Sequence, residues 1–269
     1  MRPPSRSDSS DPSPPVRRVP PEAERPGART DAIGFSAVTR RHGRRPVVVD
    51  LSFEVRAGEI FGLVGTNGAG KTTCIKCLLD LCHLDAGRIH IFGRSATAPE
   101  SRRSLAYLPE RFVPPRHLLG REFLHLMSRL HAVDPGLDST RGRQREVLAA
   151  LDLAPSALDE PVRHYSKGMA QKLGLAACLL AEKPLLVLDE PMSGLDPKAR
   201  VLARRYLRRL RDGGATVFLS THLLADTGDL CDRLGVLHDG AMRFVGSPAC
   251  LRERFPAATL EESWIACVS

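Results

Sequence analysis

Eight consecutive residues decide the fold of this chain: Gly65-Thr66-Asn67-Gly68-Ala69-Gly70-Lys71-Thr72. They fit the pattern G-x-x-x-x-G-K-[ST], follow a stretch typical of a strand and precede one typical of a helix, which is the context that a phosphate-binding P-loop requires. Glycines let successive backbone N–H groups turn toward a phosphate chain, and the start of the helix adds its dipole. A chance glycine-rich turn would lack both flanking elements. We therefore assign the loop and the residue after it to nucleotide binding: Gly65, Thr66, Asn67, Gly68, Ala69, Gly70, Lys71, Thr72 and Thr73.

Four side chains have specific expected roles in this site. Lys71 is expected to reach the β- and γ-phosphates as a catalytic residue, and the Thr72 hydroxyl to bind Mg²⁺. The apolar stretch 185–188 predicts a buried strand that ends in Asp189 and Glu190. Because the carboxyl ends of parallel strands meet at one edge of a sheet, both acids should lie beside the phosphates. Asp189 would hold Mg²⁺ through water, and Glu190 would orient and deprotonate the attacking water.

Strands and helices alternate along the rest of the chain, which predicts an α/β fold. The core is expected to consist of 31–109 and 185–255, with a helical subdomain, 110–184, inserted into it. Short stretches rich in branched residues predict strands at 33–39, 47–55, 59–64, 88–92, 185–188 and 216–219, and a hairpin of 234–237 with 242–245. Apolar spacing predicts helices at 118–130, 144–151, 169–182, 197–211, 223–231 and 248–254.

Charge and composition limit the possible partners. The 269-residue chain has a formal net charge of +8, and residues 1–45, with ten Arg, no Lys and five acids, supply +5 of it. The remainder is close to balanced, so no nucleic-acid partner is expected. Residues 1–30 hold eight of the 21 prolines without a periodic apolar pattern, which predicts a disordered tail. No apolar stretch reaches the roughly 18 residues of a membrane span, and none resembles a secretory signal, so we expect a cytoplasmic protein.

A second motif carries a resemblance to a known family. Tyr165-Ser166-Lys167-Gly168-Met169 resembles the signature motif of ATP-binding-cassette (ABC) ATPases, whose usual form, Leu-Ser-Gly-Gly-Gln, it departs from at three of five positions. Ser166 and Gly168 open a predicted helix, and a helix N-terminus favours anions. In the family this motif closes over the γ-phosphate of an ATP held by another subunit. The resemblance therefore implies a head-to-tail dimer, formed with a second copy or a homologous ATPase subunit.

Other family positions match one residue at a time. Ser193-Gly194-Leu195-Asp196 resembles the loop that touches the opposite subunit, which places Asp196 in the shared nucleotide site. His222 resembles the switch histidine that contacts the γ-phosphate, a catalytic role. His42 stands where the family usually has an aromatic residue on adenine, and an imidazole can stack there with less area. Glu110 stands where the family usually has a Gln that binds Mg²⁺, and it keeps an oxygen ligand while adding charge.

The resemblance covers residues 31–255 and implies a P-loop NTPase core of ABC ATPase type. The combination of Tyr107-Leu108-Pro109-Glu110 with the signature motif resembles the ATPases of ABC-2 type exporters. The short C-terminal tail, 256–269, contains a stretch, 259–264, that also resembles this subgroup. The expected function is Mg²⁺-dependent ATP hydrolysis that powers export through a separate membrane permease, on the inner face of the cell membrane. One alternative is a soluble ABC ATPase that acts on ribosomes or nucleic acid. Another is a non-enzymatic, nucleotide-gated scaffold, and the presence of both Glu190 and His222 disfavours this scaffold.

Three further features allow two interpretations each. Cys74, Cys77 and Cys82 have a metal-like spacing but are expected to pack on the helix after the P-loop. The basic helix 197–211 could touch anionic lipid or nucleic acid, although a solvated face opposite a buried stripe is the expectation. Four apolar residues near the start of the insert could dock the permease or simply pack the insert: Phe112, Val113, Leu118 and Leu119.

Overall fold

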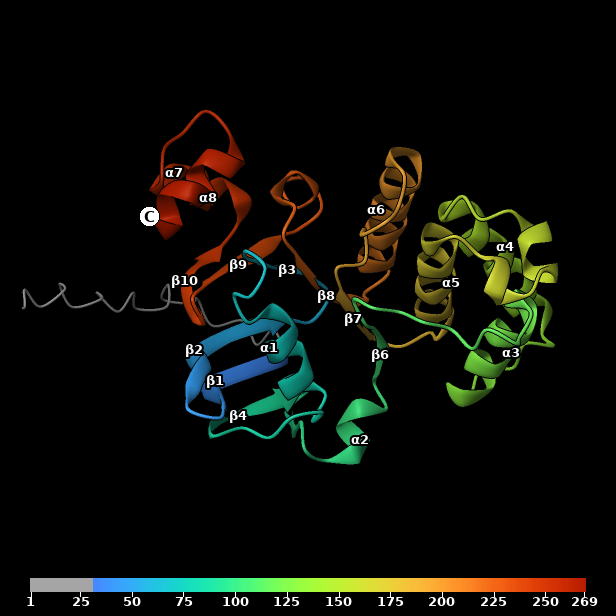
Figure 1. Ribbon diagram of the computed structural model, residues 1–269, viewed down its shortest axis with the longest axis horizontal. Coiled ribbons are helices and arrows are strands. Elements are labelled where there is room, and N and C mark those ends of the chain that lie inside the picture. The colour runs from blue at the N-terminus through green and yellow to red at the C-terminus, as the bar shows by residue number, and fades with distance from the viewer. Residues whose placement is uncertain (1–30) are drawn as a thin grey trace, which may run out of the picture.

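Two β-sheets form the centre of the computed structural model, which describes residues 31–269, so the expected tail 1–30 lies outside the described residues (Figure 1). One sheet is antiparallel, with strand order β2-β1-β4-β5. Its strands are β1 (Asp31–His42), β2 (Arg45–Arg56), β4 (Ala86–Ile91) and β5 (Arg94–Ser95). Branched and aromatic residues face one side of β1 and β2, as expected for a sheet with one buried face.

The second sheet has the order β10-β9-β3-β8-β7-β6 and is parallel except for its edge strand β10. Its strands are β3 (Ile60–Val64), β6 (Leu105–Leu108), β7 (Leu185–Asp189), β8 (Thr216–Thr221), β9 (Arg233–His238) and β10 (Ala241–Gly246). β3, β7 and β8 are buried at every position, which explains the nearly continuous apolar sequences of β3 and β7 and the apolar centre of β8. The carboxyl ends of these three strands therefore meet at one edge of the sheet.

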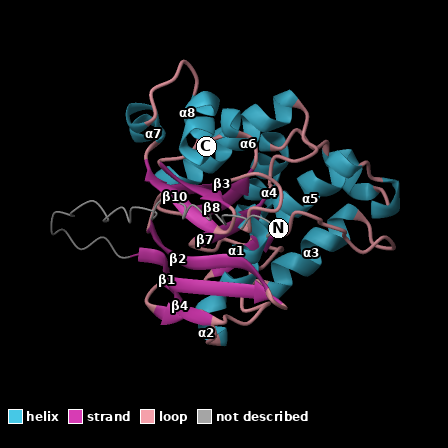
Figure 2. Ribbon diagram, turned by 60° about the vertical axis from the view of Figure 1, so that its left-hand side comes forward, coloured by secondary structure: helices cyan, strands magenta, loops and turns pink. Residues whose placement is uncertain are grey.

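Helix α1 (Lys71–Leu78) lies between the two sheets (Figure 2), and a row of aromatic rings packs in the same space. The ring centroids of Phe35 and Phe53 are 4.5 Å apart, those of Phe53 and Phe61 5.5 Å, and those of Phe61 and Phe218 6.1 Å. Phe35 and Phe53 belong to the antiparallel sheet, whereas Phe61 and Phe218 belong to the parallel one. The row thus joins the two sheets into one core.

The segment 110–184 between β6 and β7 is largely helical and lies to one side of the sheets in Figure 1; it is called the insert below. It contains α3 (Gly120–Leu130), α4 (Asp138–Ala150), the 3₁₀ turns η1 (Pro155–Asp159) and η2 (Val162–His164), and α5 (Lys167–Leu180). Phe112 packs edge-on against Phe123 at 5.6 Å and covers Gly174, and Leu118 packs on the same core. Two of the four suggested docking residues therefore pack the insert, whereas Val113 is 79% exposed.

The remaining helices are α2 (Pro99–Arg102), α6 (Pro197–Asp212), α7 (Pro248–Arg254) and α8 (Leu260–Val268). In α6, Tyr206 and Leu207 are buried while the arginines surround them, as expected of a solvated basic face. None of the helices within residues 31–269 is both long and apolar enough to cross a membrane.

Three expectations were wrong or incomplete. The helix predicted at 223–231 is only the 3₁₀ turn η3 (Leu224–Asp226), because Thr227 bonds back to the Leu224 carbonyl through both its amide and its hydroxyl, at 2.8 Å each. The C-terminal tail contains α8, which a capping box of Thr259 and Glu262 starts. Cys82 lies beyond the end of α1, although its sulfur is 3.3 Å from that of Cys77 and both cysteines pack on the core.

Replacing Phe218 should weaken this core strongly. Phe218 is fully buried and contacts rings of both sheets, so Phe218→Ala is expected to lower the free energy of unfolding by about 3–5 kcal/mol. Chemical denaturation followed by circular dichroism measures the change. Leu81→Ala, at a side chain that is 65% exposed, is the control and should change it by less than about 0.5 kcal/mol. Equal losses in the two variants would contradict the proposed core.

Candidate nucleotide-binding and catalytic site

The P-loop between β3 and α1 is held tightly by its neighbours. A Cβ on Gly65 would lie 2.4 Å from the Leu237 carbonyl oxygen, and one on Gly70, whose φ is +108°, would lie 2.9 Å from that of Val47. The Gly240 amide, in the turn between β9 and β10, donates to the Ala69 carbonyl at 3.1 Å. These close approaches fix the course of the loop, and they explain why glycines are required at its first and sixth positions.

Lys71 begins α1 and is buried, with a side chain that is 7% exposed. Its Nζ donates to the Gly65 carbonyl at 2.7 Å and to the Thr66 carbonyl at 3.2 Å. The same Nζ lies 3.6 Å from Oε1 of Glu190. The lysine therefore joins the P-loop to the acidic residues at the end of β7.

Asp189, the last residue of β7, is fully buried. The Ser220 hydroxyl of β8 donates to its Oδ1. Burial raises the pKa of the Asp189 carboxyl, while the hydroxyls of Ser220 and Thr72 lower it and the charge of Glu110 raises it. Oδ2 has no hydrogen-bond partner among the described residues. An orphaned carboxylate oxygen beside the Thr72 hydroxyl is a donor set that suits a small divalent cation, so these residues fit Mg²⁺.

Glu190 follows Asp189 with an unusual backbone φ of +51°. Its amide donates to the Ser220 hydroxyl at 3.0 Å and to the Ser220 carbonyl at 3.2 Å, which holds this conformation. Oε2 is 2.8 Å from Nδ1 of His222, which follows β8 and is 42% exposed. The carboxylate thus lies between Lys71 and His222. A strained backbone retained by its surroundings is common at functional sites.

A second group of predicted site residues surrounds the beginnings of α5 and α6. The Ser166 hydroxyl caps α5 by accepting from the Met169 amide at 3.1 Å. Gly168 faces the loop before α6, where an added Cβ would lie 2.8 Å from the Gly194 carbonyl oxygen. Asp196 caps α6 through the Ala199 amide at 2.9 Å, and this bond lowers the pKa of its carboxyl. These residues link the two helices to each other.

Lys172 of α5 strengthens that link and was not foreseen. It is buried, and its Nζ donates to Oδ2 of Asp196 at 3.1 Å and to the Asp152 carbonyl at 3.0 Å. Ser220 was also missed, although it stands two residues before His222 in a strand at the same sheet edge. His42 ends β1, where its backbone pairs with Arg45, and Glu110 follows β6; both side chains are exposed.

Comparisons with known proteins identify the family. Residues 48–193 match the model of the ABC transporter family. The Nod factor export ATP-binding protein I of Burkholderia orbicola is 38% identical over 225 residues, which cover 82% of this chain and 72% of that protein. The daunorubicin resistance ATP-binding protein DrrA3 of Streptomyces coeruleorubidus is 37% identical over a match that covers 78% of this chain and 66% of that protein. An uncharacterized ABC transporter ATP-binding protein of Synechocystis is 38% identical, and the match spans only 56% of its length.

Solved structures share the fold. The structure of an ATP-binding subunit of an ABC transporter superposes with a TM-score of 0.80 at 32% identity, covering 88% of this chain and 99% of that one. The structure of a bacterial Atm1-family ABC exporter with ATP bound gives a TM-score of 0.71 at 25% identity, and the match covers 88% of this chain and 42% of that one. The predicted α/β P-loop fold and the predicted family are therefore confirmed, and the chain belongs to the ATP-binding proteins of the ABC transporter family.

Proposed function

We propose that this chain binds and hydrolyses ATP and thereby powers transport through a separate membrane permease. The observation that carries the proposal is the placement of the Glu190 carboxylate between Lys71, 3.6 Å away, and His222, 2.8 Å away. The three residues lie where the P-loop, β7 and β8 end, which is the edge at which parallel sheets bind nucleotides. A base beside the phosphate-binding lysine is what distinguishes a hydrolase from a nucleotide-binding scaffold.

Each residue has a distinct step in the proposed reaction. Lys71 exchanges its contacts with the loop carbonyls for the β- and γ-phosphates, while the loop amides, with Thr73 at the start of α1, hold the phosphate chain. Glu190 accepts a proton from the water that attacks the γ-phosphorus. His222 holds the Glu190 carboxylate through Nδ1 and orients the transferred phosphoryl group. The leaving group is ADP, and the released product is phosphate.

We propose Mg²⁺ as the cofactor, held by Thr72 and Asp189 with Glu110 nearby. The buried Asp189 oxygen without a hydrogen-bond partner supports this assignment. The exposed Glu110 supplies a further carboxylate, whose charge raises the pKa of Asp189 in the described structure. When bound, the ion neutralises charge that develops on the phosphate oxygens.

The second group, Ser166, Gly168 and Asp196, supports a dimer. These residues sit at the beginnings of α5, within the insert, and of α6 beside it, and Figure 1 shows both helices apart from α1. We propose that they meet the nucleotide of a second copy, or of a homologous ATPase subunit, packed head to tail. A helix N-terminus with an exposed hydroxyl cap suits a γ-phosphate.

Export is the direction that we propose for transport. The relatives above include proteins named for Nod factor export and for daunorubicin resistance. We place the chain on the cytoplasmic face of the membrane, with the permease docked near Glu110 at the entrance to the insert, where Val113 is exposed. A soluble ABC ATPase on ribosomes or nucleic acid is not favoured by these relatives.

Two substitutions should block the reaction for different reasons. Lys71→Ala removes the phosphate-binding cation, so ATP binding is lost. Glu190→Gln keeps binding but removes the base, so ATP hydrolysis should fall by at least about 100-fold while an ATP-bound dimer accumulates. Phosphate release and size-exclusion chromatography with Mg²⁺ and ATP measure both effects.

The exposed Glu100 provides the control for these variants. Glu100→Gln should hydrolyse ATP at the wild-type rate and form no trapped dimer. Wild-type hydrolysis by Glu190→Gln would show that the base is misassigned, whereas its failure to dimerise would refute the shared site.

Removing the buried charge of Asp189 should abolish Mg²⁺ binding without lowering the stability of the protein. Because burial raises the pKa of its carboxyl, ionised Asp189 at neutral pH costs stability, so Asp189→Asn should melt at or above the wild-type temperature without ligands. In the wild type, Mg²⁺ with ATP should raise the melting temperature more than ATP alone does, and Asp189→Asn should lose this difference. Asp85→Asn should instead lower the melting temperature, because Asp85 accepts from the Arg41 amide at 2.8 Å. A destabilised Asp189→Asn that keeps its Mg²⁺ response would refute the site.

His42 should make a weak contact with the adenine base. Stacking contributes about 1 kcal/mol, so His42→Ala should weaken ATP binding severalfold and His42→Tyr, with a larger ring, should strengthen it. Isothermal titration calorimetry measures both, with the exposed His83→Ala as the control. Unchanged affinity in both His42 variants would place the base elsewhere.

A further inference from the structure

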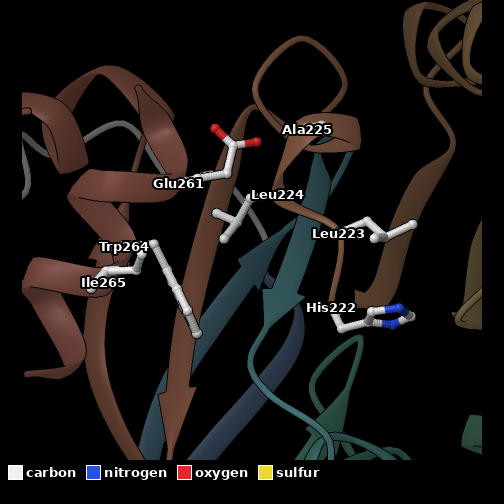
Figure 3. A pocket seen from close by; sticks show the side chains of 7 residues that line it. All are labelled: His222, Leu223, Leu224, Ala225, Glu261, Trp264 and Ile265. Carbon is white, nitrogen blue, oxygen red and sulfur yellow. The ribbon is translucent and has the colours of Figure 1, made fainter. Parts of the chain in front are cut away.

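The chain after His222 lies against the C-terminal helix α8. Residues of both elements line a cavity of about 280 Å³ beside this contact. In Figure 3 the imidazole of His222 points away from this cavity, whereas the side chain of Leu224 points toward Glu261 and Trp264 of α8. The segment thus has two faces, one toward Glu190 and one toward α8.

Leu224 anchors the second face in a small apolar cluster. It is only 6% exposed and packs with Val64, Leu234 and Val236, while Trp264 and Leu260 cover the same cluster from α8. Val64 is the residue before Gly65 and pairs with Thr221, which precedes His222. Trp264 therefore packs on a cluster that includes Val64, the residue before the P-loop, and Leu224, two residues after His222.

His222 lies outside regular secondary structure, so strand or helix hydrogen bonds do not hold its position. β8 ends at Thr221, and the segment then forms only η3, stabilised by the local hydrogen bonds of Thr227. The Leu223 amide donates to the Thr221 hydroxyl at 3.0 Å. Farther along, Gly228 lies against Leu260, whose Cδ2 would be 3.3 Å from an added Cβ. Packing under α8 is thus one long-range restraint on this segment, beside the contact of His222 with Glu190 and the Arg208 side chain that donates to the Asp229 carbonyl.

We propose that Trp264 is a positioning residue for the reaction, which holds His222 within reach of Glu190 by packing on the apolar cluster that contains Leu224. The proposal rests on the function proposed above, because it gives His222 a part in hydrolysis. Trp264 itself touches neither nucleotide nor the reacting groups. Its indole packs on apolar side chains and its Nε1 has no hydrogen-bond partner among the described residues, so shape and size are what matter.

The first measurement needs no ATP. Histidine ring signals in the NMR spectrum of the full chain, assigned with His222→Gln, report the environment of the His222 imidazole. In Trp264→Ala the His222 signal should move toward that of a free imidazole, whereas Trp264→Phe, which keeps an aromatic ring over Leu224, should restore it. The neighbouring Ile265, 53% exposed and outside the apolar cluster, gives the matched control Ile265→Ala, which should leave the signal unchanged.

The second measurement uses hydrolysis. Trp264→Ala should lower kcat by about 10- to 100-fold with little change in KM, because a small displacement of a reacting group has effects of this size. The affinity for ATP should stay at the wild-type value, and Trp264→Phe should recover most of kcat. A purely structural role would instead lower the melting temperature and the affinity together.

The outcomes separate this proposal from the function on which it rests. A wild-type His222 signal in Trp264→Ala refutes the positioning role whether or not the protein hydrolyses ATP. A displaced signal together with no ATPase activity in the wild type refutes the proposed function but supports the positioning of His222. If Trp264→Ala does not fold, Trp264→Leu replaces it, and a wild-type signal there overturns the proposal in the same way.

Discussion

Parallel pairing of β3 with β8 and of β8 with β7 is the constraint on which the site depends. It sets Val64 beside Thr221 and Asp189 beside Ser220, so the loops that follow these strands begin at one edge of one sheet. Lys71 and His222 then approach Glu190 from opposite sides, although they are separated by about half of the chain. The aromatic row from Phe35 to Phe218 supports this edge by fixing the antiparallel sheet against the parallel one.

The same edge concentrates groups that are costly to bury. Asp189 is fully buried, with one carboxylate oxygen that no group within residues 31–269 bonds to, and the adjacent Glu190 has a left-handed backbone conformation. Ser220 offsets part of both costs, because its hydroxyl donates to the Asp189 carboxylate and accepts from the Glu190 amide. Such a site lowers stability in exchange for placing charged groups where phosphate and metal chemistry needs them. Ser220 is thereby essential to the geometry without belonging to any recognisable motif.

Local patterns in the sequence predicted the motifs and most elements but not the interactions between distant segments. The P-loop and the strand ending in Asp189 were recognisable, because glycine geometry and apolar stretches are local properties. The helix expected at 223–231 is absent, since the back-bonding of Thr227 and the packing of Leu224 on α8 outweigh apolar spacing. Lys172 was missed for a similar reason: its partners, Asp152 and Asp196, are 20 and 24 residues away. The roles of His42 and Glu110 rest on resemblance alone, because nothing in their local sequence identifies a ligand.

Two elements remote from the P-loop hold residues that the proposed reaction needs. Lys172 ties the beginning of α5 to the cap of α6, so Ser166 and Asp196 move as one unit if the insert moves. Trp264 and Leu260 secure the segment of His222 from the C-terminal helix. In the proposed dimer, the first unit would meet the nucleotide of another subunit, whereas the second would position His222 beside the nucleotide of its own chain. Hydrolysis that needs both units would then require two chains packed head to tail, so the proposed reaction would depend on how the two chains are held together.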